Sequence, residues 1–147
     1  MFGIFTLGEP TNMEDELVQP SSIIINDFKE KLYLPLAYWD VETYKRNWLN
    51  SLEEGFYKKN HSALAVSMYE PSKVNFIFTW VLYYEGQNVY VQNNVIFLDK
   101  CDKFIPENIN EFIELRAIYD EDGMKISEWV TDMKSVLGFF YSLHGLK

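Results

Sequence analysis

Apolar and polar positions alternate with a period of two in the first third of the chain, which is the pattern of a half-buried β-strand. Leu32, Leu34 and Leu36 share one side of a predicted strand over residues 31–36. A preceding strand over residues 22–28 is centred on three consecutive isoleucines. Residues 8–19, by contrast, are polar and acidic, and we expect them to form a surface loop.

The middle of the chain predicts three more strands. They cover residues 62–69, 75–84 and 89–98 and are rich in β-branched and aromatic residues. Short connections join them, so neighbouring strands must run antiparallel. Both faces of the middle strand are largely apolar, which predicts a central strand that is covered on both sides. One face carries Phe76, Phe78, Trp80 and Leu82, and the other carries Ile77, Thr79, Val81 and Tyr83.

A helical period replaces the alternation over residues 41–57, where Asp40 is the expected N-cap. Pro106 predicts a second helix over residues 107–116, and a short strand is expected over residues 124–128. Thr131 or Asp132 caps a final helix whose buried face carries Met133, Val136, Leu137, Phe140 and Leu143. The predicted fold class is α+β, with a mostly antiparallel β-sheet packed against two or three helices.

Composition is consistent with one folded domain over residues 1–147. Hydrophobic residues make up 48% of the chain and aromatic residues 17%, which is too much for a disordered protein. The longest apolar runs are too short to span a bilayer as a helix, and the first residues lack the basic region of a secretory signal. Cys101 is the only cysteine, so no internal disulfide can form. A cytoplasmic location is therefore expected.

Negative charge is concentrated in two blocks. Residues 1–28 hold five acids and no Lys or Arg, a net charge of −5. Residues 99–123 hold eight acids and three bases, which is again −5, out of −9 for the whole chain. Such a field attracts basic partners and speeds their encounter with the protein. It also argues against direct binding of nucleic acid or of an anionic membrane, because both carry negative charge.

Motifs for catalysis or metal binding do not accompany this charge. His61 and His144 lack partners at metal-ligand spacing, and Cys101 lacks a recognisable base. The acidic run that ends at Gly123 lacks the alternating ligands and distal Glu of a calcium loop. We therefore expect a binding protein without cofactor or metal, and not an enzyme.

Several segments together resemble a known family. They are Leu-Pro-Leu-Ala-Tyr-Trp-Asp at residues 34–40, followed by Tyr44, Trp48 and Leu52, and further motifs at residues 61–68, 78–83, 89–93 and 126–129. This pattern, which spans about residues 22–143, resembles the immunity proteins of bacterial contact-dependent growth inhibition systems. The resemblance implies a cytoplasmic protein that binds and neutralises a toxin domain carried at the C-terminal end of a large exoprotein. Many such toxins are basic nucleases.

The family offers no universal binding residues, so the toxin-binding surface is predicted from charge and aromatic content. Acidic side chains would steer a basic toxin domain and cover its active site or substrate channel. Aromatic side chains at or near a hairpin tip would add exposed contact area. The predicted toxin-binding residues are Glu14, Asp15, Glu16, Asp120, Glu121, Asp122, Tyr83, Tyr84 and Tyr90.

A second hypothesis is a small enzyme or ligand-binding domain with an aromatic-lined pocket. It requires polar groups with displaced pKa values that converge inside a concavity. Carboxylates or His61 at the base of a deep cleft would favour this alternative. A convex acidic surface without a cleft would favour the inhibitor.

Overall fold

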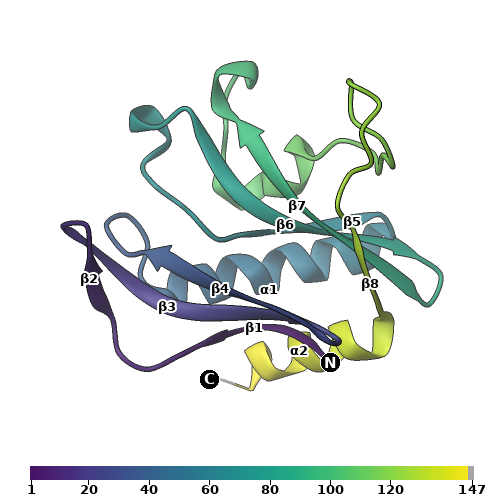
Figure 1. The fold of residues 1–147 in the computed structure, drawn as a ribbon, viewed down its shortest axis with the longest axis horizontal. Coiled ribbons are helices and arrows are strands. Elements are labelled where there is room, and N and C mark those ends of the chain that lie inside the picture. The colour runs from purple at the N-terminus through teal and green to yellow at the C-terminus, as the bar shows by residue number, and fades with distance from the viewer. Residues whose placement is uncertain (146–147) are drawn as a thin grey trace.

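The computed structural model describes residues 1–145, and within them eight strands form two four-stranded antiparallel sheets. Two α-helices pack against these sheets, which confirms the predicted α+β class (Figure 1). No helix within this range is both long enough and apolar enough to cross a membrane.

The first sheet is built around β3 (Glu16–Ile25). One edge of β3 pairs with β1 (Phe2–Thr6) and then with β2 (Thr11–Met13), and the other edge pairs with β4 (Phe28–Pro35). The second sheet has the order β5 (His61–Ala65), β6 (Phe76–Glu85), β7 (Asn88–Phe97) and β8 (Trp129–Asp132). The prediction that β6 is a central strand is confirmed, because β5 and β7 flank it.

Helix α1 (Val41–Lys58) begins where its sequence predicts. The Asp40 carboxylate accepts a hydrogen bond from the Thr43 backbone N–H at 2.8 Å and satisfies a donor left free in the first turn. The helix ends at Lys59, which adopts the left-handed conformation (φ 58°). Trp48 is fully buried, and its indole N–H donates to the Ala65 carbonyl at 2.8 Å, so α1 is tied directly to β5.

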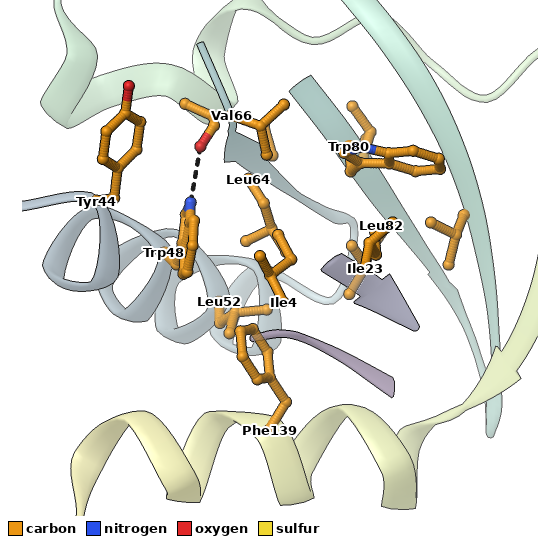
Figure 2. Packing of buried hydrophobic residues seen from close by; sticks show 14 of the residues in the cluster. Ile4, Ile23, Tyr44, Trp48, Leu52, Leu64, Val66, Trp80, Leu82 and Phe139 are labelled. Atoms are coloured by element: carbon orange, nitrogen blue, oxygen red, sulfur yellow. Dashed lines mark hydrogen bonds between the residues drawn. The ribbon is translucent and has the colours of Figure 1, made fainter. Parts of the chain in front are cut away.

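The main core lies between the two sheets and the two helices (Figure 2). Leu64 of β5 and Leu82 of β6 face Ile23 of β3 there. Helix α1 contributes Leu52 to this core, and α2 (Met133–His144) contributes Phe139. Asp132 caps α2 by accepting from the Ser135 N–H at 2.7 Å, which confirms one of the two predicted caps.

The N-terminal region differs from its prediction. Residues 8–19 form β2 and the beginning of β3 in place of a loop. Glu14 and Asp15 make the two-residue turn, with φ of 52° and 65°. Because neither is a glycine, the usual hairpin signal is missing from the sequence. Strand β1 was not predicted, since Phe2, Gly3 and Ile4 are all buried and the strand shows no alternation.

Two predictions in residues 101–128 were wrong. The expected helix over residues 107–116 is instead 3₁₀-helix η3 (Pro106–Phe112), interrupted at Asn108 (φ −110°, ψ 32°). Asn110 explains part of the difference, because its side chain accepts from the Ala63 N–H and donates to the Ser51 carbonyl. The expected strand over residues 124–128 is only a bridge between Tyr119 and Lys125. Two further 3₁₀ turns are η1 (Pro71–Lys73) and η2 (Leu98–Lys100).

Candidate functional site

A groove of about 840 Å³ opens between the two sheets. Residues 30–33 of β4 form one wall, and β6 and β7 form the other. Its apolar lining is Leu32, Tyr33, Val66, Phe78, Trp80, Val95 and Phe97. The strand register explains this lining, because Phe78 lies opposite Val95, and Trp80 lies opposite Asn93, on one face of the second sheet.

One end of the groove is closed by packed aromatic rings. The Phe28 ring lies 4.5 Å from that of Trp129, and the Trp80 ring lies 5.4 Å from that of Trp129, centroid to centroid. These three residues come from β4, β6 and β8, so they join the two sheets at this point. Such ring pairs add about 0.5–1.5 kcal/mol each beyond the area they bury, which favours a fixed closed end.

The same face of the second sheet is uncovered at its other end. Phe76, Phe78 and Phe97 are 44%, 48% and 49% exposed. Phe76 lies directly opposite Phe97 in the register, and its ring centroid is 5.3 Å from that of Phe78. Three exposed rings side by side form a contiguous apolar patch, and such patches on soluble proteins mark interaction surfaces.

An acidic turn lies at the rim of this groove. Asp120 is among the lining residues, and its carboxylate accepts backbone N–H groups from Asp122 and Met124, both at 2.9 Å. Gly123 has φ of 79°, which a residue with a side chain rarely adopts. The predicted turn at residues 120–123 is therefore confirmed, and its side chains are exposed.

A charged network fixes the chain on both sides of this turn. The Arg116 guanidinium donates to both carboxylate oxygens of Glu128, at 2.6 and 2.8 Å, and lies 3.8 Å from the centre of the Tyr90 ring. The Gln92 amide donates to Glu128 at 2.7 Å and to the Ala117 carbonyl at 3.0 Å. The hydrogen bond from Arg116 lowers the pKa of Glu128 and raises that of Arg116. The pair therefore stays charged at neutral pH.

The other predicted acidic segment lies elsewhere. Glu14 and Asp15 are exposed at the tip of the β2–β3 hairpin, at the left of Figure 1, whereas the turn at residues 120–123 lies at the upper right. Glu16 accepts a hydrogen bond from the Tyr69 hydroxyl at 2.9 Å. Burial, followed by this contact, raises the pKa of Tyr69 to about 12. The structure thus does not bring the two acidic segments together.

The predicted tyrosines are less accessible than the sequence suggested. Tyr83 is only 6% exposed, and its hydroxyl donates to the Glu114 carbonyl, so the expectation that it reaches solvent is wrong. Tyr84 and Tyr90 are half-buried, under Phe56 and Arg116 respectively. Residues 101–128 cover Tyr83 and Tyr90 on one face of the second sheet, whereas Tyr84 lies on the other face, against Phe56 of α1. These contacts could not be read from local periodicity.

Groups suited to catalysis do not converge in the groove. His61 is buried away from it, with its Nε2 atom 2.8 Å from the Asn110 carbonyl oxygen. Among the described residues, no cluster of His, Cys, Asp and Glu could hold a metal ion. The side chains with displaced pKa values, such as Tyr44, Tyr84 and Glu128, line other parts of the molecule.

The exposed aromatic residues of the groove were absent from the predicted site. Sequence periodicity placed Phe76 and Phe78 on the same face as Trp80, which the register confirms. It could not show that the first sheet covers Trp80 and leaves Phe78 open. The polar Asn93, opposite Trp80 on an otherwise apolar strand face, was the available signal that this face is not covered along its whole length.

Comparisons with known proteins agree with this fold and with the resemblance found in the sequence. Residues 34–139 match the family described as the CdiI N-terminal domain. The Immunity protein CdiI of Enterobacter cloacae subsp. cloacae is 68% identical over 144 residues, which cover 98% of this chain and 99% of that protein. The solved CdiA-CT/CdiI toxin and immunity complex from Enterobacter cloacae contains a chain that superposes with a TM-score of 0.95, at 68% identity and 99% coverage of both chains.

Proposed function

Because this chain belongs to the family of CdiI immunity proteins, we propose that it binds a CdiA-CT toxin domain and neutralises it. One observation carries the proposal. A relative with 68% identity and nearly the same fold has been solved in a complex of toxin and immunity protein. At that level of similarity, the two chains share their fold. The chain acts as an inhibitor and carries out no reaction of its own.

Charge supports the further proposal that the toxin domain is basic and that it is a nuclease. The chain carries a net charge of −9, and its acidic turn is exposed. Nucleases need a cationic surface to hold phosphates, and carboxylates can occupy such a surface. Asp120, Glu121 and Asp122 would meet the toxin, with Glu14, Asp15 and Glu16 adding to the long-range field. Tyr84 and Tyr90 could contribute only their exposed edges, and Tyr83 is too buried to contribute.

The proposal also covers location and domain organisation. A toxin that acts inside the target cell must be met there, so the immunity protein works in the cytoplasm. The single cysteine, Cys101, suits a reducing compartment. Residues 1–147 act as one domain, which agrees with a structural match that extends over 99% of both chains.

A survival assay tests the proposed function. Bacteria that express the toxin domain from the C-terminal end of the exoprotein encoded beside this chain should stop growing, and co-expression of the chain should restore growth. An unrelated acidic protein of similar size serves as the control for charge. If the toxin domain arrests growth equally with and without the chain, the proposed function is wrong.

An assay on purified components tests the nature of the toxin. The toxin domain should degrade RNA or DNA, and equimolar chain should stop the degradation. A toxin domain that leaves both nucleic acids intact while still killing cells would refute the nuclease proposal. It would not affect the proposal that the chain is an immunity protein.

A further inference from the structure

We propose that the groove between the two sheets is the docking surface for the toxin domain, with Phe78 and Phe97 as its apolar anchors. This inference rests on the proposed function and adds the place of binding. The occupant is a segment of the toxin domain that presents an apolar side chain flanked by Lys or Arg. Three features of the groove point to such an occupant.

The first feature is the uncovered apolar surface. The second sheet is covered at its Trp80 end by Phe28 of β4, whereas Phe78 and Phe97 remain about half exposed. Leaving such rings in water costs about 25 cal/mol for each Å² of apolar surface that could be buried. A further contact to these rings within residues 1–145 comes from Lys100, whose Nζ atom lies 5.2 Å from the centre of the Phe97 ring and leaves that ring about half exposed. A partner that fills the open end of the groove would bury them.

The second feature is charge complementarity. The charged residues that line the groove are Glu30, Lys31 and Asp120, and Glu121 and Asp122 follow at the rim. Lys100 adds one positive charge beside Phe97, and the mouth of the groove remains net negative, at −2 over these six residues. A cationic protein segment would be attracted to this mouth, and a nucleic acid would be repelled. The same charge opposes the approach of a second copy of this chain.

The third feature is that hydrogen bonds hold the acidic turn at residues 120–123 in a fixed position against the second sheet. The bidentate pair between Arg116 and Glu128 holds the two ends of residues 116–128 together, and Gln92 ties Ala117 to the second sheet. Asp120 then shapes the turn through its own backbone contacts. A carboxylate group that is already ordered loses little conformational entropy on binding. Aromatic anchors beside ordered charges are the arrangement found at energetic centres of protein interfaces.

The test is a titration of the purified toxin domain with variants of this chain. The double variant Phe78→Ala/Phe97→Ala should weaken binding by about 100-fold or more, because central aromatic residues dominate interface energies. The matched control is Tyr57→Ala/Tyr141→Ala, which removes two aromatic side chains that are 88% and 63% exposed outside the groove. The control should change the dissociation constant by less than about threefold.

A second variant separates a loss of toxin binding from a loss of folding. Asn93 is exposed within the groove, so Asn93→Arg adds bulk and positive charge without removing a buried contact. It should also weaken toxin binding by at least tenfold, as judged from the steric block and the repulsion of a cationic segment. Asn88→Arg, on the same strand but outside the groove, is its control. Circular dichroism checks that every variant is folded.

The outcomes separate this inference from the proposed function. If the unsubstituted chain binds the toxin and the groove variants bind equally well, the toxin docks elsewhere and only this inference falls. If the unsubstituted chain does not bind the toxin, both fall together. If the groove variants convert a dimer of this chain into a monomer without changing toxin binding, the occupant is a second copy, which also overturns the inference.

Discussion

At the scale of single residues, one buried hydroxyl group with two hydrogen-bond partners fixes how three parts of the core fit together. The Tyr44 hydroxyl donates to the Pro35 carbonyl at 2.8 Å and accepts from the Met68 N–H at 2.9 Å. It thereby links the end of β4, helix α1 and the chain after β5. Burial raises the pKa of Tyr44, so the hydroxyl stays protonated and keeps both bonds.

The Tyr44→Phe variant tests this link. It keeps the ring but leaves a buried carbonyl and a buried N–H without partners, so the free energy of unfolding should fall by about 2–4 kcal/mol. Tyr141→Phe is the matched control, because Tyr141 is exposed and should lose less than about 0.5 kcal/mol. Urea unfolding measures both. Equal stability of the two variants would show that the Tyr44 hydroxyl contributes nothing.

The Arg116–Glu128 pair makes a prediction about pH. The hydrogen bond from Arg116 lowers the pKa of Glu128 below the value of about 4.3 expected in the unfolded chain. The ionised Glu128 therefore contributes its full amount to the free energy of unfolding at pH values above its unfolded-state pKa. This contribution is lost as the pH falls through the lower pKa of the folded state. Glu128→Gln should lower stability at pH 7 by about 1–3 kcal/mol and by less at pH 3. Unfolding curves at both pH values test this, and an equal loss at each would contradict it.

At the scale of elements, close approach between α1 and β5 depends on one glycine. A Cβ atom at Gly55 would collide with the Ser62 side chain and would lie only 2.5 Å from the His61 carbonyl oxygen. Gly138 of α2, by contrast, has open space where a Cβ would be. The two glycines have the same helix propensity but different surroundings, so they form a matched pair.

Alanine at these two positions should have opposite effects. Gly138→Ala should raise the free energy of unfolding by about 0.5–1 kcal/mol, because alanine favours the helix. Gly55→Ala should lower it by about 1–3 kcal/mol, since the helix and strand must move apart. Thermal and urea unfolding measure both. A stabilised Gly55→Ala variant would show that the contact between α1 and β5 can relax freely.

Elements with a complete local signal were predicted, and those fixed by tertiary contacts were not. Helix α1 has a capping residue and a continuous apolar stripe, and both are visible in sequence. Strand β1 has no alternation, because neighbours cover it on both faces, and the β2–β3 turn uses Glu14 and Asp15 in place of glycine. Helix α2 was predicted with Asp132 as one of two alternative caps, but without Phe139, which packs against Phe2 with ring centroids 5.7 Å apart.

At the scale of the whole molecule, the two acidic blocks of the sequence lie at different places on the surface. The two acidic blocks contribute −5 each. Folding carries Glu14 and Asp15 to one end of the molecule and Asp120 to the rim of the groove (Figure 1). Sequence alone could predict the acidic character and the family. It could not predict which block borders exposed aromatic residues, because that depends on how the two sheets diverge.

Association kinetics test the role of the turn. Neutralising it with Asp120→Asn, Glu121→Gln and Asp122→Asn should slow association with the toxin about tenfold at low salt, and much less at 0.5 M salt, where charges are screened. Asparagine at position 120 keeps an oxygen for the turn's backbone N–H groups. Neutralising Glu14, Asp15 and Glu16 removes the same charge farther from the groove and should slow association less. An unchanged association rate at low salt would show that the turn is not part of the toxin interface.

Binding of the toxin domain by the purified chain is the most direct test of the whole account. Calorimetric titration, run beside an assay of toxin activity on RNA and DNA, measures complex formation and neutralisation in the same samples. The account predicts saturable binding, with toxin activity falling in proportion to the fraction bound and disappearing at saturation. Absence of binding, or full toxin activity in the presence of excess chain, would contradict it.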